Sequence, residues 1–183
     1  MGPGTRNLPQ PEPSFKNKSC HMQIRDATIA DLPAIVAIYN STVPSRMVTA
    51  DTEPVSVESR QKWFQDHSPA HRPLWVAEEN GHIAGWLSYS SFHTRPAYQS
   101  TCELSIYIAS GYRRRGLGAE LLARSIGHAP KIGVTTLIGL IFGHNEPSLR
   151  LFEKFGFKRW GHLPRVATLD GIERDVVIVG RRC

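Results

Sequence analysis

The sequence has few cysteines and no long apolar run. Its 183 residues contain only Cys20, Cys102 and Cys183, an odd number with wide spacing that suits neither a disulfide framework nor a metal site. The longest apolar stretches, such as 136–142, are too short to cross a bilayer, and residues 1–19 contain no apolar segment of the signal-peptide kind. We therefore expect a protein of the reducing cytoplasm, with no metal and no membrane partner.

The charge balance favours an anionic partner. There are 22 Lys and Arg residues against 16 Asp and Glu, a formal net charge of +6. A nucleic-acid binder would carry a basic stripe with interleaved aromatic residues, whereas the densest basic run here, Arg113 to Arg115, is followed at once by Gly-Leu-Gly. Such a run is more typical of a phosphate cradle, so we do not expect a nucleic-acid partner.

Composition along the chain predicts one folded domain with a tail. Residues 1–21 are rich in proline and glycine and offer little apolar side chain to bury, so we expect them to be a disordered N-terminal tail. Residues 22–183 are long enough for one domain with a substantial core.

Apolar periodicity within residues 22–183 predicts an α/β fold. Helical spacing is found between Thr28 and Pro44, and over 56–67, 117–128 and 147–155. Strand patterns cover 22–25, 74–78, 83–91, 101–108, 134–142, 157–160, 165–169 and 176–179. Asn80-Gly81 predicts a tight hairpin between two of these strands. We expect a mixed, twisted central sheet of about six or seven strands flanked by about four helices.

The segment Arg113-Arg114-Arg115-Gly116-Leu117-Gly118 fits the pattern R-x-x-G-x-G between a strand and a helix. Glycines let backbone N–H groups approach an oxyanion, and a helix N-terminus adds a positive field. A solvated helix start with a few basic residues is the other interpretation of this pattern taken alone.

A second motif lies downstream and connects the chain to a known family. Residues 145–157 read Asn-Glu-Pro-Ser-Leu-Arg-Leu-Phe-Glu-Lys-Phe-Gly-Phe, which resembles the N-x-x-S-x-x-L-aromatic-x-x-x-G-F pattern of the GNAT acetyltransferase superfamily. The basic glycine loop resembles that family's acetyl-CoA loop, and the resemblance extends from about Met22 to Arg181. It implies a single GNAT-like N-acetyltransferase domain over 22–183 that uses acetyl-CoA as its cosubstrate.

The resemblance also implies which residues contact acetyl-CoA. Strand residues Ile106, Tyr107 and Ile108 would face the pantetheine arm. The pyrophosphate would be bound by the loop residues Arg113, Arg114, Arg115, Gly116, Leu117 and Gly118. Asn145 and Ser148 would contact the cofactor farther along, although the position of Asn145 before Pro147 also suits a helix N-cap.

Glu103 is the candidate general base. Acetyl transfer needs a neutral amine, and a carboxylate near the acetyl group can remove the proton. Residues 101–108, Thr-Cys-Glu-Leu-Ser-Ile-Tyr-Ile, resemble the corresponding stretch of the phosphinothricin N-acetyltransferase group. That group acetylates small amino acids and analogues such as methionine sulfoximine and sulfone, and it implies Tyr98 and Thr101 as substrate-binding residues and a homodimer. The other interpretation of Glu103 is a strand carboxylate paired with an arginine.

The sequence departs from that group at two places. Relatives often carry Arg just before the Thr101 position, where this chain has Gln99, and Ile172-Glu173 also differs from their pattern. Arg95 or Arg174 could bind a substrate carboxylate instead. Three alternatives therefore stay open: a small amino-acid acceptor, a protein N-terminus or polyamine acceptor, and a CoA-binding sensor without turnover. No general acid is assigned, because Phe152 replaces a tyrosine common in the family.

Overall fold

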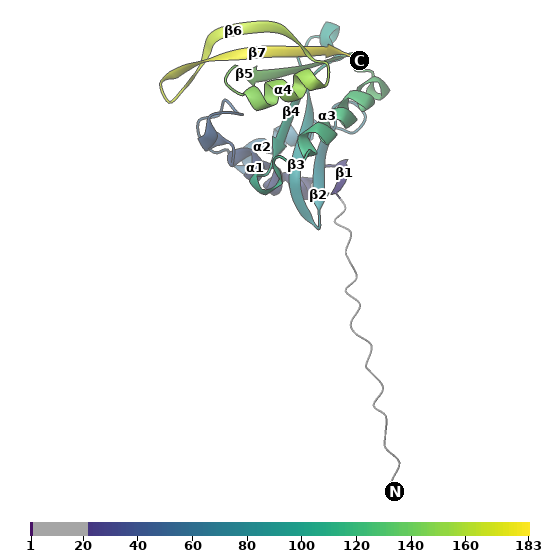
Figure 1. The fold of residues 1–183 in the computed structure, drawn as a ribbon. Helices are drawn as coiled ribbons and strands as arrows, with labels where there is room; N and C mark the ends of the chain where they lie inside the picture. Colours follow the sequence, from purple (N-terminus) through teal and green to yellow (C-terminus); the bar gives the residue numbers. More distant parts are fainter. Residues whose placement is uncertain (2–21) are drawn as a thin grey trace.

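A seven-stranded sheet organises the chain (Figure 1). The structure, a computed structural model, describes Met1 and residues 22–183, so the tail expected over residues 1–21 lies outside the described residues apart from Met1. The sheet order is β1-β2-β3-β4-β5-β7-β6. The strands are β1 Met22–Asp26, β2 Leu74–Glu79, β3 His82–Ser91, β4 Thr101–Ile108, β5 Thr136–Phe142, β6 Lys158–Leu169 and β7 Ile172–Arg182.

Within the described residues, four α-helices cover the two faces of the sheet, α1 and α2 on one and α3 and α4 on the other (Figure 1). They are α1 Leu32–Asn40, α2 Val57–Gln65, α3 Leu117–His128 and α4 Glu146–Lys154. The α/β architecture expected from the sequence is confirmed. No helix within the described part of the chain is long and apolar enough to span a membrane.

Strand alternation divides the core into two layers. On β2, Trp75 and Ala77 pack in the larger cluster with α3 and α4, whereas Leu74 and Val76 pack in the smaller cluster beneath α1. Successive strand side chains point to opposite faces, so a strand covered on both sides is apolar at nearly every position. β5 follows this rule, because every residue except Leu140 is buried.

Short polar signals fix the element boundaries. Asn80 and Gly81 both have positive φ angles, 53° and 81°, as the tight β2–β3 hairpin requires. Gly156, at φ 80°, follows the C-terminal end of α4. Ahead of α1, the Asp31 carboxylate accepts hydrogen bonds from the Thr28 N–H and hydroxyl at 2.7 and 3.0 Å, and one turn of 3₁₀ helix, Ile29–Asp31, leads into the helix.

The C-terminal third differs from the expectation. The prediction of three separate strands, over 157–160, 165–169 and 176–179, is wrong, because the chain forms one long hairpin of β6 and β7. Gly161 and Pro164 look like strand breaks in the sequence, but bulges between Arg159 and Gly161 and between Leu163 and Ala167 absorb them.

The feature that creates a binding site is the divergence of β4 from β5. These are the only parallel neighbours in the described sheet, joined through α3 as the sequence predicted. Their pairing covers only Thr101–Glu103 against Thr136–Ile138. Beyond Glu103, the edge of β4 that faces β5 has no strand partner within the described residues, and space opens beside it.

Candidate active site

A groove of about 790 Å³ lies beside the free edge of β4 and extends past the N-termini of α3 and α4. We call it the long groove. Every residue that the sequence assigned to the cofactor lines it except Arg115: these are Ile106, Tyr107, Ile108, Arg113, Arg114, Gly116, Leu117, Gly118, Asn145 and Ser148. The two motifs are about thirty residues apart in the sequence, and the fold brings them together.

The loop before α3 has the backbone geometry of an anion cradle. Arg114 and Gly116 adopt positive φ angles of 61° and 85°, and α3 begins at Leu117. The first N–H groups of a helix have no partners within the helix, so those of α3 remain available to an anion at this end of the groove. Arg113 and Arg114 add positive charge beside them.

Arg115 has a different partner. Its guanidinium forms an ion pair with the buried Glu79 carboxylate at 2.9 Å, and it lies over the Tyr112 ring at 5.1 Å. The structure therefore directs Arg115 toward the end of β2 rather than into the long groove. This contact holds the loop against the β2–β3 hairpin.

Asn145 combines two structural contacts with its position in the groove. Its side-chain oxygen accepts a hydrogen bond from the Ser148 N–H at 3.3 Å, which makes it the N-cap of α4. Its amide nitrogen donates to the Met47 carbonyl at 2.9 Å. The second contact draws the α1–α2 loop over the groove, where Thr42, Ser45, Met47 and Val48 join the lining. This contribution of the α1–α2 loop to the groove was not predicted from the sequence.

A second, smaller cavity of about 180 Å³ lies between the sheet and helices α1 and α2. We call it the inner cavity. Its walls are mostly aromatic and aliphatic, with three serines on the sheet and one charged residue. The lining consists of Ile35, Val36, Tyr39, Val55, Arg60, Trp63, Trp86, Ser88, Ser90, Ser105 and Tyr107.

The inner cavity and the long groove share Tyr107, which lines both. The Tyr107 ring stacks on Trp86 with a centroid distance of 4.4 Å, and burial raises the pKa of its hydroxyl. Ser105 lines the inner cavity and also the small recess of about 150 Å³ beside the long groove. β4 thus separates the two spaces with a wall one strand thick.

Glu103 lies on the β4 face that bounds the inner cavity. It is in register with Ser90 and two residues from Ser105, both of which line that cavity. Burial raises the pKa of its carboxyl above the ordinary value of 4.5. No basic side chain in the described residues forms an ion pair with it, so the alternative of an arginine-paired strand carboxylate is not what the structure contains.

Tyr98 and Thr101, expected at the substrate, do not line either space. Tyr98 is exposed and packs against Phe92 with a centroid distance of 5.6 Å, while Thr101 begins β4 opposite Thr136. The walls of the inner cavity come instead from α1, α2 and the adjoining residues of β3 and β4. Arg60 and Trp63 are three residues apart and so lie on the same side of α2, which places a charge beside the apolar stripe of that helix. That signal could have indicated the cavity.

The mixed sheet with one diverging parallel pair and the basic glycine loop that opens α3 are the features expected of the acyl-CoA-dependent transferase class that the sequence motifs resemble. The model of the acetyltransferase (GNAT) family matches residues 35–157, and the chain belongs to this family. The sequence is 53% identical over 161 residues to the provisionally named phosphinothricin acetyltransferase YwnH of Bacillus subtilis, covering 87% of this chain and 98% of that protein.

Two further relatives bear on the chemistry. An L-methionine sulfoximine/L-methionine sulfone acetyltransferase of Pseudomonas aeruginosa is 34% identical, covering 85% of this chain and 91% of its own. The crystal structure of a phosphinothricin acetyltransferase from Sinorhizobium meliloti, solved with acetyl-CoA, superposes with a TM-score of 0.83 at 29% identity and covers 88% of both chains.

Proposed function

We propose that this protein transfers the acetyl group of acetyl-CoA to the amine of a small amino acid or amino-acid analogue, of the phosphinothricin and methionine sulfoximine or sulfone type. The observation that carries the proposal is the arrangement around β4. A groove with an anion cradle lies at one edge of the strand, a small cavity that opens to solvent lies on one face, and Tyr107 borders both. Glu103 does not itself line the cavity, but it lies on the same strand face, beside the lining residues Ser90 and Ser105.

The residues of the long groove suit acetyl-CoA. The pyrophosphate would meet the α3 N-terminus with Arg113 and Arg114, and the amide-rich pantetheine arm would follow the free backbone edge of β4 at Ile106–Ile108. Arg115 would act on the loop through Glu79 rather than on the phosphates. The thioester would then reach the segment of β4 that borders the inner cavity.

Glu103 supplies the proton acceptor in this proposal. An amino acid arrives as an ammonium ion, and the carboxylate takes one proton from it so that the nitrogen lone pair is free. The amine nitrogen then bonds to the acetyl carbon and the carbon–sulfur bond breaks. As the CoA thiolate leaves, the nitrogen releases its second proton to give the neutral amide, and that proton accounts for the one that the thiolate takes up. Because burial raises the pKa of Glu103, the carboxylate is a better proton acceptor near neutral pH than an exposed one.

The size of the inner cavity supports a small acceptor. Its volume of about 180 Å³ is below the roughly 300–1,000 Å³ of pockets that enclose drug-sized ligands. An amino acid fits such a space, whereas a polypeptide terminus or a long polyamine would have to extend out of it. The substrates of the relatives named above are consistent with this choice.

The homodimer and the cytoplasmic location belong to the same proposal. The β6–β7 hairpin exposes a group of large apolar side chains that a second copy could cover: Trp160, Leu163, Val166 and Ile172. Light scattering coupled to gel filtration measures the mass directly, and a single-chain mass at micromolar concentration would argue against the dimer.

The experiment is an acetyl-transfer assay that follows thiol release at pH 8. The acceptor panel contains phosphinothricin, methionine sulfoximine, methionine sulfone, the common amino acids, a short peptide and spermidine. We expect turnover of amino-acid acceptors, and a loss of about 10²- to 10⁴-fold in Glu103→Gln, the range for removal of a general base. Glu153→Gln, a surface carboxylate on α4, is the matched control and should retain full activity.

Other results would change the conclusion. Turnover of the peptide or spermidine alone would assign a different acceptor to the same fold. Binding of acetyl-CoA without turnover of any amine would indicate a sensor. Unchanged activity in Glu103→Gln would remove Glu103 from the role of base.

A further inference from the structure

Arg60 is the one charged residue that lines the inner cavity, among the residues that the structure describes. It projects from the first turns of α2 into a wall otherwise made of aromatic, aliphatic and serine side chains. A guanidinium attracts anionic oxygens strongly where apolar neighbours exclude water. Arg60 therefore favours a ligand that brings an anionic oxygen into the cavity.

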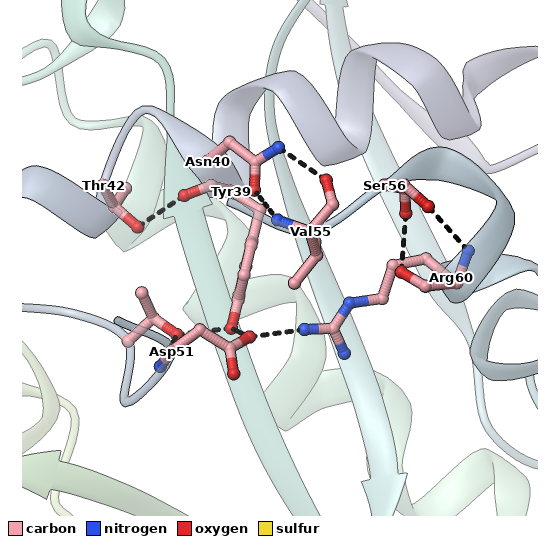
Figure 2. Close-up of polar contacts among 9 residues, drawn as sticks. Tyr39, Asn40, Thr42, Asp51, Val55, Ser56 and Arg60 are labelled. Atoms are coloured by element: carbon pink, nitrogen blue, oxygen red, sulfur yellow. Dashed lines mark hydrogen bonds and ion pairs between the residues drawn. The ribbon is translucent and has the colours of Figure 1, made fainter. Parts of the chain in front are cut away.

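The surrounding residues fix the position of this guanidinium (Figure 2). One terminal nitrogen donates to the Asp51 carboxylate at 2.7 Å, and the guanidinium carbon lies 4.9 Å from the centre of the Tyr39 ring. The Tyr39 hydroxyl also donates to Asp51, at 2.5 Å. Asp51 thus binds a residue of α1 and a residue of α2 and connects the two walls of the cavity.

The backbone around Arg60 is fixed as well (Figure 2). Asn40, the last residue of α1, exchanges two hydrogen bonds with the backbone of Val55, at 2.8 and 2.9 Å. Ser56 then caps α2 by accepting from the Ser59 N–H at 3.2 Å. Arg60 therefore starts from a constrained helix, and little conformational entropy is lost when it binds a ligand.

Most of the hydrogen-bonding capacity of Arg60 is unused by the described residues. A guanidinium has five N–H donors, and the hydrogen bond to Asp51 uses one of them. The Arg60 side chain is 29% exposed, and it borders the cavity. The remaining donors can form a second, bidentate contact with two oxygens of a ligand.

We propose that Arg60 binds an acidic or strongly polarised oxygen group of the acceptor inside the inner cavity, with Asp51 as its positioning residue. This inference rests on the proposed function and specifies its acceptor. Arg95 is exposed in a loop, and Arg174 lines a separate groove with His162 and Asp175, so neither borders the inner cavity.

Two groups of an amino-acid analogue have this chemistry: the α-carboxylate, and a distal sulfonyl, sulfoximine or phosphinate oxygen. Three acceptors separate them. Methionine sulfone has both groups, norleucine has only the carboxylate, and 3-(methylsulfonyl)propylamine has only the sulfonyl. Initial rates with each acceptor are measured at saturating acetyl-CoA for the wild type, Arg60→Met, Arg60→Lys and Lys62→Met. Lys62 lies on the outer side of the same helix and loses the same charge.

We expect Arg60→Met to lower kcat/KM for methionine sulfone by about 10- to 100-fold, the range for loss of a charge-assisted contact. The loss in kcat/KM should come mainly from a higher KM. It should disappear for the acceptor that lacks the group, carboxylate or sulfonyl, that Arg60 binds. Arg60→Lys should recover part of it, and Lys62→Met should match the wild type. The affinity for acetyl-CoA, measured by titration calorimetry, should stay the same in all variants.

Equal losses for all three acceptors, or no loss for any, would overturn the role of Arg60. If Arg60→Met does not fold, as judged by its melting curve, Asp51→Asn tests the same contact while it retains the guanidinium. That variant should raise KM with the same dependence on acceptor. A wild type that acetylates no amine would refute the proposed function itself, whereas a wild type that does so alongside an equally active Arg60→Met would refute only the present inference.

Discussion

Replacement of Asp31 by asparagine should measure how much the ion pair between Asp31, just before α1, and Arg25, on the edge strand β1, stabilises the fold. The Asp31 carboxylate accepts two hydrogen bonds from Arg25, at 2.7 and 2.9 Å, and two more from Thr28. The same Arg25 pairs with Glu78 on β2 at 2.8 Å. Asparagine has nearly the same shape as aspartate but carries no charge. Its NH2 group would replace a carboxylate oxygen that accepts a hydrogen bond, and so would point a donor at another donor.

The pKa of Asp31 gives the size of the effect. The hydrogen bonds from Arg25, the largest contribution, and those from Thr28 lower it from 3.8 to about 2. At about 1.4 kcal/mol per pKa unit, this difference corresponds to roughly 2 kcal/mol of folding free energy at neutral pH. For a domain of this size, we expect Asp31→Asn to lower Tm by about 4–8 °C at pH 7.

The pH dependence has a definite sign. A carboxyl whose pKa is lower in the folded state stabilises the protein above its unfolded pKa, and this contribution is lost as the pH falls through the folded value. The difference between the wild type and Asp31→Asn should therefore be full at pH 7, fall to about half near pH 3, and vanish below pH 2.

Urea unfolding curves at a series of pH values provide the assay, with Asp66→Asn as the control. Asp66 forms an exposed i,i+4 pair with Lys62, and its replacement should cost at most about 0.5 kcal/mol. A cost below this value for Asp31→Asn at pH 7, or a cost that does not change between pH 7 and pH 3, would refute the reasoning.

Two further predictions concern the site. Glu103→Gln should raise Tm at pH 8, because burial raises the pKa of this carboxyl and the buried charge opposes folding. The gain in Tm should disappear as the pH falls below 4.5. A Tm below that of the wild type at pH 8 would contradict the burial argument. Gly116→Ala should cost about 1–2 kcal/mol and weaken acetyl-CoA binding, because its φ of 85° disfavours any side chain although no atom lies within 4 Å of a Cβ there. Gly127→Ala, in α3 with equally open space, should instead stabilise the protein by about 0.5–1 kcal/mol in the same thermal scan. Equal effects of the two alanines would exclude the φ angle as the cause.

The sequence predicted the elements that depend on local signals. β4 and α3 begin and end at the expected residues, and the Asn80-Gly81 hairpin has the expected positive φ angles. These features follow from short-range periodicity and from residues that tolerate a left-handed backbone. The residues assigned to the cofactor, except Arg115, line one groove because both motifs lie next to element ends that the topology brings together. Their contact with acetyl-CoA stays a prediction.

Features that depend on long-range contacts were not predictable. The direction of Arg115 is set by Glu79, 36 residues away in the sequence. The α1–α2 loop reaches the long groove because Asn145 donates to the Met47 carbonyl across 98 residues. The continuous β6 was missed because bulges accommodate Gly161 and Pro164, and a bulge depends on the partner strand rather than on the residues themselves.

The short pairing of β4 with β5 has a consequence for how the molecule is held together. Strand pairing between the two halves of the sheet, β1 to β4 on one side and β5 to β7 on the other, covers three residue pairs, and the shared core adds side-chain packing. A ligand that hydrogen-bonds along the free edge of β4 and contacts α4 takes the place of the missing strand. Such a ligand adds to the contacts between the two halves, so we expect occupancy of the groove to increase the resistance of the sheet to unfolding.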